Sequence, residues 1–203
     1  MKNEHQDIIP QADLNRLIQT ARRSGAIDAT VISTKDIIIE DALAELCKTP
    51  GCENYGLSMS CPPKVSGPAG FRELLENYNK AVVFKIDVAF EILFSNERND
   101  WFHLLHEISA EIEHSAFEMG YTDAKAFAGG SCKQIFCKDY IDCRVLTENG
   151  ECRYPESARP SMSGFGINVK KLMKTARFNC DDSKTRSDNN PSTGTLSGLI
   201  LIN

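Results

Sequence analysis

Seven of the eight cysteines in this 203-residue chain fall into two short segments. The first segment has the spacing C-x4-C-x8-C and holds Cys47, Cys52 and Cys61. The second has the spacing C-x4-C-x5-C-x8-C and holds Cys132, Cys137, Cys143 and Cys152. Their neighbours are Gly, Pro, Lys and Asp, among which a packed hydrophobic side chain has little to bury against. Clustered thiols in such surroundings indicate metal binding or redox chemistry rather than core packing.

Both segments have the glycines and prolines of stiff, close-fitting loops. Pro62 and Pro63 hold Cys61 in a turn that cannot continue as a helix, and glycines let the backbone approach the sulfurs. We therefore take residues 47–63 and 129–155 as cysteine-rich metal-binding loops, with all seven cysteines as candidate ligands. The second group can close a site by itself, whereas the first needs another ligand or leaves one position open. Cys180 stands alone beside an acidic loop, and we do not expect it to be a ligand.

The spacing of the cysteines favours an iron–sulfur cluster over zinc. Zinc sites commonly use C-x2-C pairs, and the chain has none. A C-x4-C pair opens the plant-type ferredoxin loop, and a proline shortly after the last cysteine, here Cys152-x-x-Pro155, is also typical of ferredoxin loops. We expect a cluster of the 4Fe-4S type, with zinc as the alternative. Basic residues could offset its negative charge: Lys133, Lys138, Arg144, Arg153 and Arg159.

Two other kinds of metal chemistry are disfavoured. Three histidines and three glutamates share one predicted helix: His103, His106, His114, Glu107, Glu111 and Glu113. We expect these side chains on the solvated face opposite an apolar stripe, and the H-E-x-x-H spacing of zinc proteases is missing. The C-x3-C-x2-C loop of radical S-adenosylmethionine enzymes is also missing.

Composition and charge narrow the classes of partner. The formal net charge is −5, and no basic stripe is interleaved with aromatic residues, so we do not expect nucleic acid to be a partner. The N-terminal residues lack the apolar core of a signal peptide, and no run reaches the roughly 18 apolar residues of a membrane span. We therefore expect a cytoplasmic protein without a membrane partner. Thiols stay reduced in that compartment, which again favours metal over disulfides.

Hydrophobic periodicity predicts an α+β fold in a single domain, residues 1–203, long enough to bury a core. We expect a mixed β-sheet from a hairpin of residues 29–32 and 37–39, strands 81–88 and 124–128, and a C-terminal strand, 196–202. Helices 12–24 and 100–119 should cover this sheet. Both cysteine groups follow short elements that can end at one sheet edge. We therefore expect Cys61 and Cys132 in one site or in two neighbouring sites.

The order of the motifs resembles a prokaryotic family of uncharacterised, cysteine-rich predicted metal-binding proteins. The resemblance rests on Cys47-x4-Cys52-x2-Tyr55-Gly56-x4-Cys61-Pro62-Pro63, Ala128-Gly129-Gly130-Ser131-Cys132, Cys152-Arg153-Tyr154-Pro155, Arg159-Pro160-Ser161-Met162 and Gly166-Ile167-Asn168-Val169. It implies metal binding, with iron–sulfur as the expected type, and carries over no settled reaction. The family's second group is usually tighter, which leaves open whether Cys137 or Cys143 ligates, and Asn168 stands where the family usually has Asp.

Three functions fit these observations. The preferred one is an iron–sulfur redox protein that passes electrons to a redox partner protein. The second is a zinc-stabilised binding module without catalysis, and the third is an enzyme with an open iron on a three-cysteine site. The sequence alone leaves open whether the protein is an enzyme.

Overall fold

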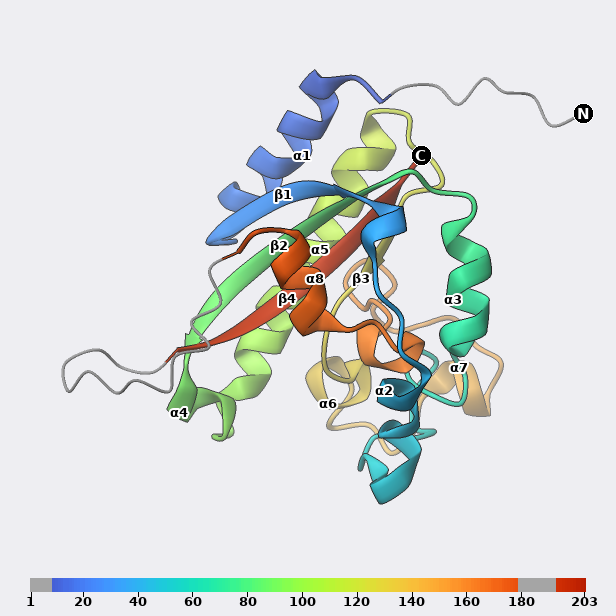
Figure 1. The fold of residues 1–203 in the computed structure, drawn as a ribbon. Helices are drawn as coiled ribbons and strands as arrows, with labels where there is room; N and C mark the ends of the chain where they lie inside the picture. Colours follow the sequence, from blue (N-terminus) through green and yellow to red (C-terminus); the bar gives the residue numbers. More distant parts are fainter. Residues whose placement is uncertain (1–8, 179–192) are drawn as a thin grey trace, which may run out of the picture.

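The computed structural model describes residues 9–178 and 193–203, in which four strands form one antiparallel sheet (Figure 1). The strand order is β1 (Asp28–Ser33), β2 (Lys80–Ala89), β4 (Thr193–Ile202) and β3 (Lys125–Phe127). The long central pair, β2 and β4, is in register from Lys80 opposite Ile202 to Ala89 opposite Thr193. The predicted α+β class is confirmed, and Cys180 lies outside the described residues.

Helices cover both faces of the sheet. On one face lie α1 (Gln11–Arg23) and the long α5 (Arg98–Glu118), and on the other lie α3 (Gly67–Leu75) and α8 (Val169–Thr175). The side chains of β2 alternate between the two cores. Val82 and Phe84 pack toward α1 and α5, whereas Val83 packs toward α3 and α8. Because both faces are buried, β2 has the nearly continuous apolar sequence of an inner strand.

The connections between these elements are short helices and turns. They include α2 (Asp41–Glu45), a helical turn at Cys47–Gly51, α4 (Phe90–Leu93), α6 (Cys132–Phe136), α7 (Arg144–Thr147) and a 3-10 turn at Met162–Phe165. No helix within the described residues is both long enough and apolar enough to cross a membrane.

Two details of the predicted sheet were wrong. Residues 37–39 form no hairpin with β1, because Thr34–Asp36 is a 3-10 turn and the Thr34 hydroxyl donates to Tyr78 O at 2.5 Å. β1 pairs instead with β2, and Ile39 makes an isolated bridge to Ile167. We also expected a mixed sheet, but all three strand pairings are antiparallel. For example, the chain leaves β1 at Ser33 and enters β2 at Lys80, which lies directly opposite Ser33. The two strands therefore run in opposite directions.

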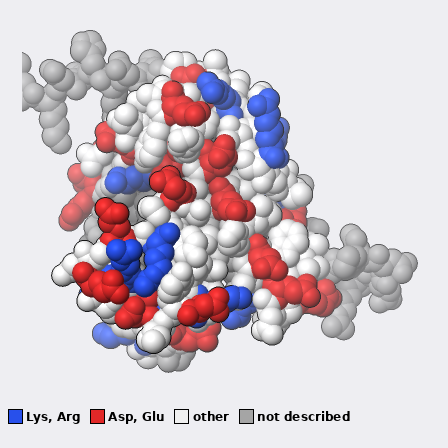
Figure 2. All heavy atoms as spheres, turned by 180° about the vertical axis from the view of Figure 1, so that it is seen from behind, with Lys and Arg blue, Asp and Glu red and all other residues white. Residues whose placement is uncertain are grey.

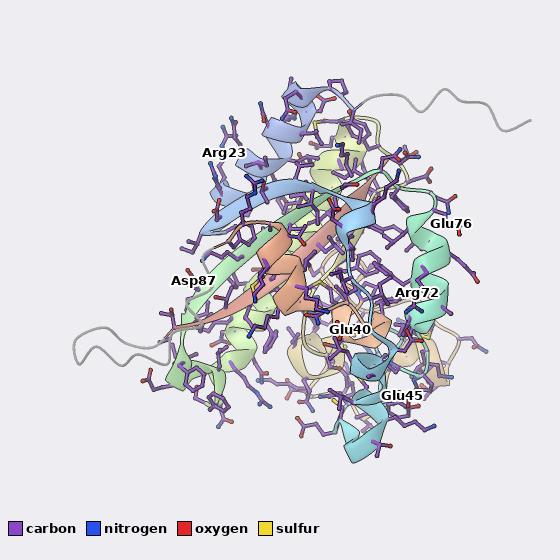
Figure 3. All side chains as sticks on the ribbon, viewed as in Figure 1. Arg23, Glu40, Glu45, Arg72, Glu76 and Asp87 are labelled. Atoms are coloured by element: carbon purple, nitrogen blue, oxygen red, sulfur yellow. The ribbon has the colours of Figure 1, made fainter. Side chains whose placement is uncertain are left out.

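The segment that leads into the first cysteine group is fixed between α3 and α8 (Figure 3). Glu40 accepts hydrogen bonds from Asn168 Nδ2 at 3.0 Å and Lys171 Nζ at 2.6 Å, and these bonds, Lys171 first, lower the pKa of its carboxyl group. Arg72 of α3 forms an ion pair with Asp41. An ionised aspartate at position 168 has no N–H group and could not donate to Glu40. The asparagine at this position therefore allows a hydrogen bond that the aspartate of the resembled family could not make.

Candidate metal centre

The two cysteine segments converge at one end of the molecule, the lower end in Figure 1, where α2, α6 and α7 lie. Four cysteines of the second segment line one cavity of about 20 Å³, which we call the four-thiol cavity: Cys132, Cys137, Cys143 and Cys152. Cys132 opens α6 and Cys143 immediately precedes α7, so two short helices orient two of the four thiols. The structure therefore brings together all four cysteines of this predicted group, including both Cys137 and Cys143.

Basic side chains surround the four-thiol cavity and also tie its loop together. Of the five basic residues named from the sequence, Lys133, Arg144 and Arg153 line the cavity. Lys133 Nζ donates to the carbonyl oxygens of Cys137 at 2.8 Å and Tyr140 at 2.6 Å. The Arg153 guanidinium lies 4.2 Å from the centre of the Tyr140 ring. These contacts place positive charge where ionised thiols would carry negative charge.

The cysteines of the first segment line a second cavity of about 180 Å³, which we call the three-thiol cavity: Cys47, Cys52 and Cys61. Cys61 is buried, Cys47 is half-buried and Cys52 is exposed, so this cavity reaches the surface on the Cys52 side. The backbone N–H of Cys52 donates to the Cys47 carbonyl at 3.0 Å and closes the turn between the two. Burial, together with the neighbouring Cys52 and Cys61, raises the pKa of the Cys47 thiol.

A thin wall of polar residues separates the two cavities. Ser58 lines the four-thiol cavity, whereas Cys61, three residues later, lines the three-thiol cavity. Across the wall, Ser131 lines the three-thiol cavity and its neighbour Cys132 lines the four-thiol cavity. The structure thus places Cys61 and Cys132 in adjacent cavities, close together as we expected.

Hydrogen bonds in this wall reach a sulfur directly. Ser60 Oγ donates to Cys132 Sγ at 2.9 Å, and Ser58 Oγ lies 3.1 Å from Ser60 Oγ. Burial raises the pKa of the Cys132 thiol, while the serine hydrogen bonds oppose that shift because they stabilise the thiolate. On the other side of the cavity, the backbone N–H of Tyr154 donates to Cys152 Sγ at 3.4 Å. Such hydrogen bonds to sulfur are the contacts expected around metal-bound thiolates.

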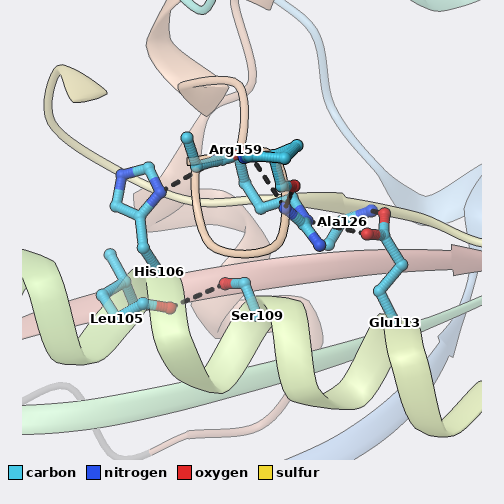
Figure 4. Close-up of polar contacts among 8 residues, drawn as sticks. Leu105, His106, Ser109, Glu113, Ala126 and Arg159 are labelled. Carbon is cyan, nitrogen blue, oxygen red and sulfur yellow. Dashed lines mark hydrogen bonds and ion pairs between the residues drawn. The ribbon is translucent and has the colours of Figure 1, made fainter. Parts of the chain in front are cut away.

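His106 of α5 fixes both ends of the second cysteine segment, and Figure 4 shows its contact with Arg159. Its Nδ1 accepts the backbone N–H of Arg159 at 3.0 Å, so its ring proton lies on Nε2, which donates to Gly129 O at 3.0 Å. The ring is completely buried and packs edge-on against Phe136, which in turn stacks on Tyr154. Burial lowers the pKa of His106 to about 4, so the ring is neutral at physiological pH.

Glu113, two turns further along α5, forms a second anchor for the same segment (Figure 4). Its Oε2 lies 2.7 Å from Arg159 Nε in an ion pair whose side chains are each 12% exposed. Its Oε1 accepts the backbone N–H of Ala126 at 2.6 Å. Arg159 therefore pairs with Glu113 of α5. It does not line the four-thiol cavity, although we had named it among the basic residues that could offset the charge of a cluster.

We predicted that His106 and Glu113 lie on a solvated helix face, and this was wrong. Four side chains at positions i, i+3, i+4 and i+7 form a buried second stripe on α5: His106, Ser109, Ala110 and Glu113. The small residues at 109 and 110 were the signal of close packing. His114, by contrast, is exposed and His103 is half-exposed, and they pair with Glu118 and Glu107 on the helix surface. Among the described residues, no three His, Cys, Asp or Glu side chains stand in an arrangement that could hold a single metal ion.

Comparison with known proteins agrees with the resemblance noted in the sequence. Residues 30–202 match the family described as "Predicted metal-binding protein (DUF2284)". No curated protein and no solved structure matches the chain. The matched range contains all seven candidate ligands and the whole of α5.

The buried His106 predicts a specific dependence of stability on pH. Its folded-state pKa of about 4 lies below the ordinary value of 6.5, so only the unfolded chain takes up its proton between these values. Its stabilising contribution is therefore present above pH 6.5 and is lost as the pH falls to 4. The free energy of unfolding, measured with urea, should fall between pH 7 and pH 4 in both proteins. The fall should be about 3 kcal/mol larger for the wild type than for His106→Gln. Equal pH dependence in the two proteins would contradict this account of His106.

Proposed function

Because the chain belongs to this family of predicted metal-binding proteins, we propose that it is a cytoplasmic iron–sulfur protein with a redox role. In this proposal, Cys132, Cys137, Cys143 and Cys152 hold a 4Fe-4S cluster. Cys47, Cys52 and Cys61 would hold a second metal centre beside it, after their side chains draw closer together than they stand in the structure. The observation that carries the proposal is the sharing of one cavity by four thiols that come from a single loop of the chain.

The donor set of the four-thiol cavity fits an iron–sulfur cluster. A 4Fe-4S cluster is held by four cysteine thiolates, and one-electron transfer is the chemistry that it supplies when bound. The cavity of about 20 Å³ is smaller than a cluster, so the loop that holds these cysteines has to open around it. Short helices and turns make up this loop, and no strand of the sheet has to move with it.

Charge and hydrogen bonding around the thiols support a redox role. Three basic residues, Lys133, Arg144 and Arg153, line the cavity and favour the thiolate form of its cysteines. The Ser60 hydroxyl donates to Cys132 Sγ and stabilises added negative charge on that sulfur. Both contacts favour the more reduced, more negative state of a bound cluster and therefore raise its reduction potential.

The surface around the first cysteine group fits a protein partner. Leu57 and Met59 are exposed by 44% and 45%, while Ser58 and Ser60 between and beside them are buried. Surface loops usually expose their polar side chains and bury their apolar ones. Here the serines are turned toward sulfur and the apolar side chains toward solvent. Ile141, in the second segment, is also completely exposed. We propose that a redox partner protein docks on these apolar side chains.

A nucleic-acid partner has no comparable support. The face shown in Figure 2 intersperses acidic and basic side chains and carries no continuous basic stripe among the described residues. The net charge of −5 also repels a polyanion at long range.

Zinc remains the alternative metal, and it would make the protein a binding module held together by its cysteines. The same thiols would then have a structural role, and Ser60 would serve only to hold Cys132 in place. Measuring iron and labile sulfide distinguishes an iron–sulfur cluster from a zinc site, because a zinc site contains neither.

Substitution of single cysteines should show two independent centres. In anaerobically purified protein, Cys132→Ser should remove most of the bound iron and sulfide, because it breaks the four-thiolate set. Cys52→Ser should remove only the smaller, second contribution. Cys180→Ser should change neither count.

Three results would contradict this assignment. Equal and complete loss in Cys132→Ser and Cys52→Ser would show one site built across both groups. Loss of metal in Cys180→Ser would make that residue a ligand. Colourless wild-type protein with stoichiometric zinc would exclude the iron–sulfur cluster itself.

The hydrogen bond from Ser60 predicts a change in redox potential. Ser60→Ala removes the donor to Cys132 Sγ, so the reduction potential of the cluster should fall by tens of millivolts while the iron content is kept. Thr147→Ala is a matched control, because the Thr147 hydroxyl donates to the Cys143 carbonyl rather than to a sulfur. Titration followed by electron paramagnetic resonance measures both. An equal shift in the two variants would contradict a direct role for Ser60.

A further inference from the structure

We propose that Cys47 and Cys52 are a redox-active pair, which closes to a reversible disulfide by exchange with a small polar disulfide. The structure shows the reduced form of this pair, because all seven cysteines that it describes are free thiols. In a reducing compartment such a disulfide is transient and has a redox-sensing or catalytic role. The inference goes beyond the proposed function, since it needs no metal on the first cysteine group.

A backbone hydrogen bond limits the distance between the two cysteines. The N–H of Cys52 donates to the carbonyl oxygen of Cys47 at 3.0 Å. A carbonyl oxygen lies about 2.4 Å from its own Cα, and an amide nitrogen lies about 1.5 Å from its own. The two Cα atoms are therefore at most about 6.9 Å apart, and that far only if all these atoms lie on one line. Disulfides join Cα atoms that are roughly 4.4–6.8 Å apart, so this pair can be bridged with little backbone movement.

Gly51 makes this close turn possible. It directly precedes Cys52 and has φ +112, a backbone conformation that L side chains rarely adopt. The chain turns back at this residue and presents the N–H of Cys52 to Cys47. Both thiols line the three-thiol cavity, so the two sulfurs face the same space.

The second cysteine segment contains a pair with the same spacing but a different backbone. Cys132 and Cys137, which we call the second pair, are also separated by four residues. Here α6 lies between them, and the N–H of Cys137 donates to Lys133 O at 3.2 Å. Residues five positions apart in an α-helix have Cα atoms about 8.6 Å apart. Because Cα atoms more than about 7 Å apart cannot be bridged without backbone movement, the first pair is the better arranged for a disulfide.

Exposure and the adjoining cavity indicate how an oxidant reaches the pair. Cys52 is exposed and Cys47 is half-buried, so a small molecule meets Cys52 first. The cavity beside them has a volume of about 180 Å³. Two buried side-chain oxygens line it without a hydrogen-bond partner, Asn54 Oδ1 and Ser131 Oγ. Because such oxygens accept N–H or O–H groups, the cavity suits a small disulfide that carries amide or hydroxyl groups.

Two exchange steps form the disulfide. The Cys52 sulfur loses its proton and attacks one sulfur of the small disulfide RSSR, whose S–S bond breaks. One RS⁻ leaves and takes up a proton, while Cys52 keeps the other half as a mixed disulfide. The Cys47 sulfur then loses its proton and attacks Cys52 Sγ, which releases the second RS⁻ to be protonated in turn. The two cysteines lose two electrons and two protons, and RSSR becomes two RSH.

Peptide mapping of the metal-free full chain tests the proposal. The chain is incubated with bis(2-hydroxyethyl) disulfide, its remaining thiols are blocked with N-ethylmaleimide, and it is digested with trypsin. Trypsin cuts after Lys48 and after Lys133, so the cysteines of each pair fall in different peptides unless a disulfide joins them. The link within the first pair should exceed that within the second pair by about tenfold, because bridging the second pair strains the backbone. Dithiothreitol should restore the thiols.

Three variants separate the turn from other causes. Gly51→Ala should reduce the link within the first pair by about three- to tenfold, because alanine is strained at this φ. Gly120→Ala is the matched control and should keep the full link. Gly120 also has a positive φ, +97, and open space around it, but it lies beyond the end of α5. Cys47→Ser should stop the reaction at the mixed disulfide on Cys52.

Several outcomes would overturn the inference. They are the absence of a link within the first pair, equal amounts of the two links in the folded chain, and equal losses in Gly51→Ala and Gly120→Ala. Urea should make the two links equal, because the spacing is the same and the turn is lost. A preference that survives in urea would therefore also contradict the proposal. None of these measurements depends on iron or sulfide, so a failure of this inference is distinguishable from a failure of the proposed function.

Discussion

The arrangement of both cysteine groups depends on one buried, neutral histidine. His106 accepts a hydrogen bond from Arg159 N and donates one to Gly129 O, so a single ring ties the start and the end of the second segment to α5. α5 is itself held against β4 and α1 by a core that includes Leu105, Ile108 and Ile112. No residue between positions 129 and 159 belongs to either buried hydrophobic core. The scaffold therefore holds the two ends of this loop, and the cysteines between those ends can move apart around a cluster.

The wall between the cavities transmits this order to the first cysteine group. Ser161 N donates to Ser60 O at 3.1 Å, so the chain that follows the second segment also holds the turn before Cys61. Gly130 makes the close approach possible. It has φ +74, and a Cβ there would meet Phe102 of α5 at 3.0 Å. A small residue with left-handed backbone is required at the point where the two segments and the helix meet. The two cavities therefore share one wall, in which Ser60 of the first segment donates to Cys132 of the second.

The sequence predicted the parts of this structure that repeat regularly and missed those that depend on single contacts. The apolar run of β2 and the stripe of α5 identified a central strand and a covering helix, because burial leaves a periodic pattern. The predicted hairpin of residues 29–32 and 37–39 does not form, because the Thr34 hydroxyl donates to Tyr78 O, 44 positions away. The grouping of the cysteines followed from their spacing. The unpartnered polar atoms of Asn54 and Ser131 did not, since such an atom can be recognised only once its surroundings are known.

The most direct test of the account is X-ray absorption at the iron and zinc edges of the anaerobically purified chain. If Cys132, Cys137, Cys143 and Cys152 hold a cluster, the iron edge should show a shell of sulfur neighbours and, beyond it, scattering from neighbouring iron atoms. That second shell should disappear in Cys132→Ser. A zinc edge with four sulfurs at about 2.3 Å and no iron would contradict the account, because it would make the centre a closed structural site without redox chemistry.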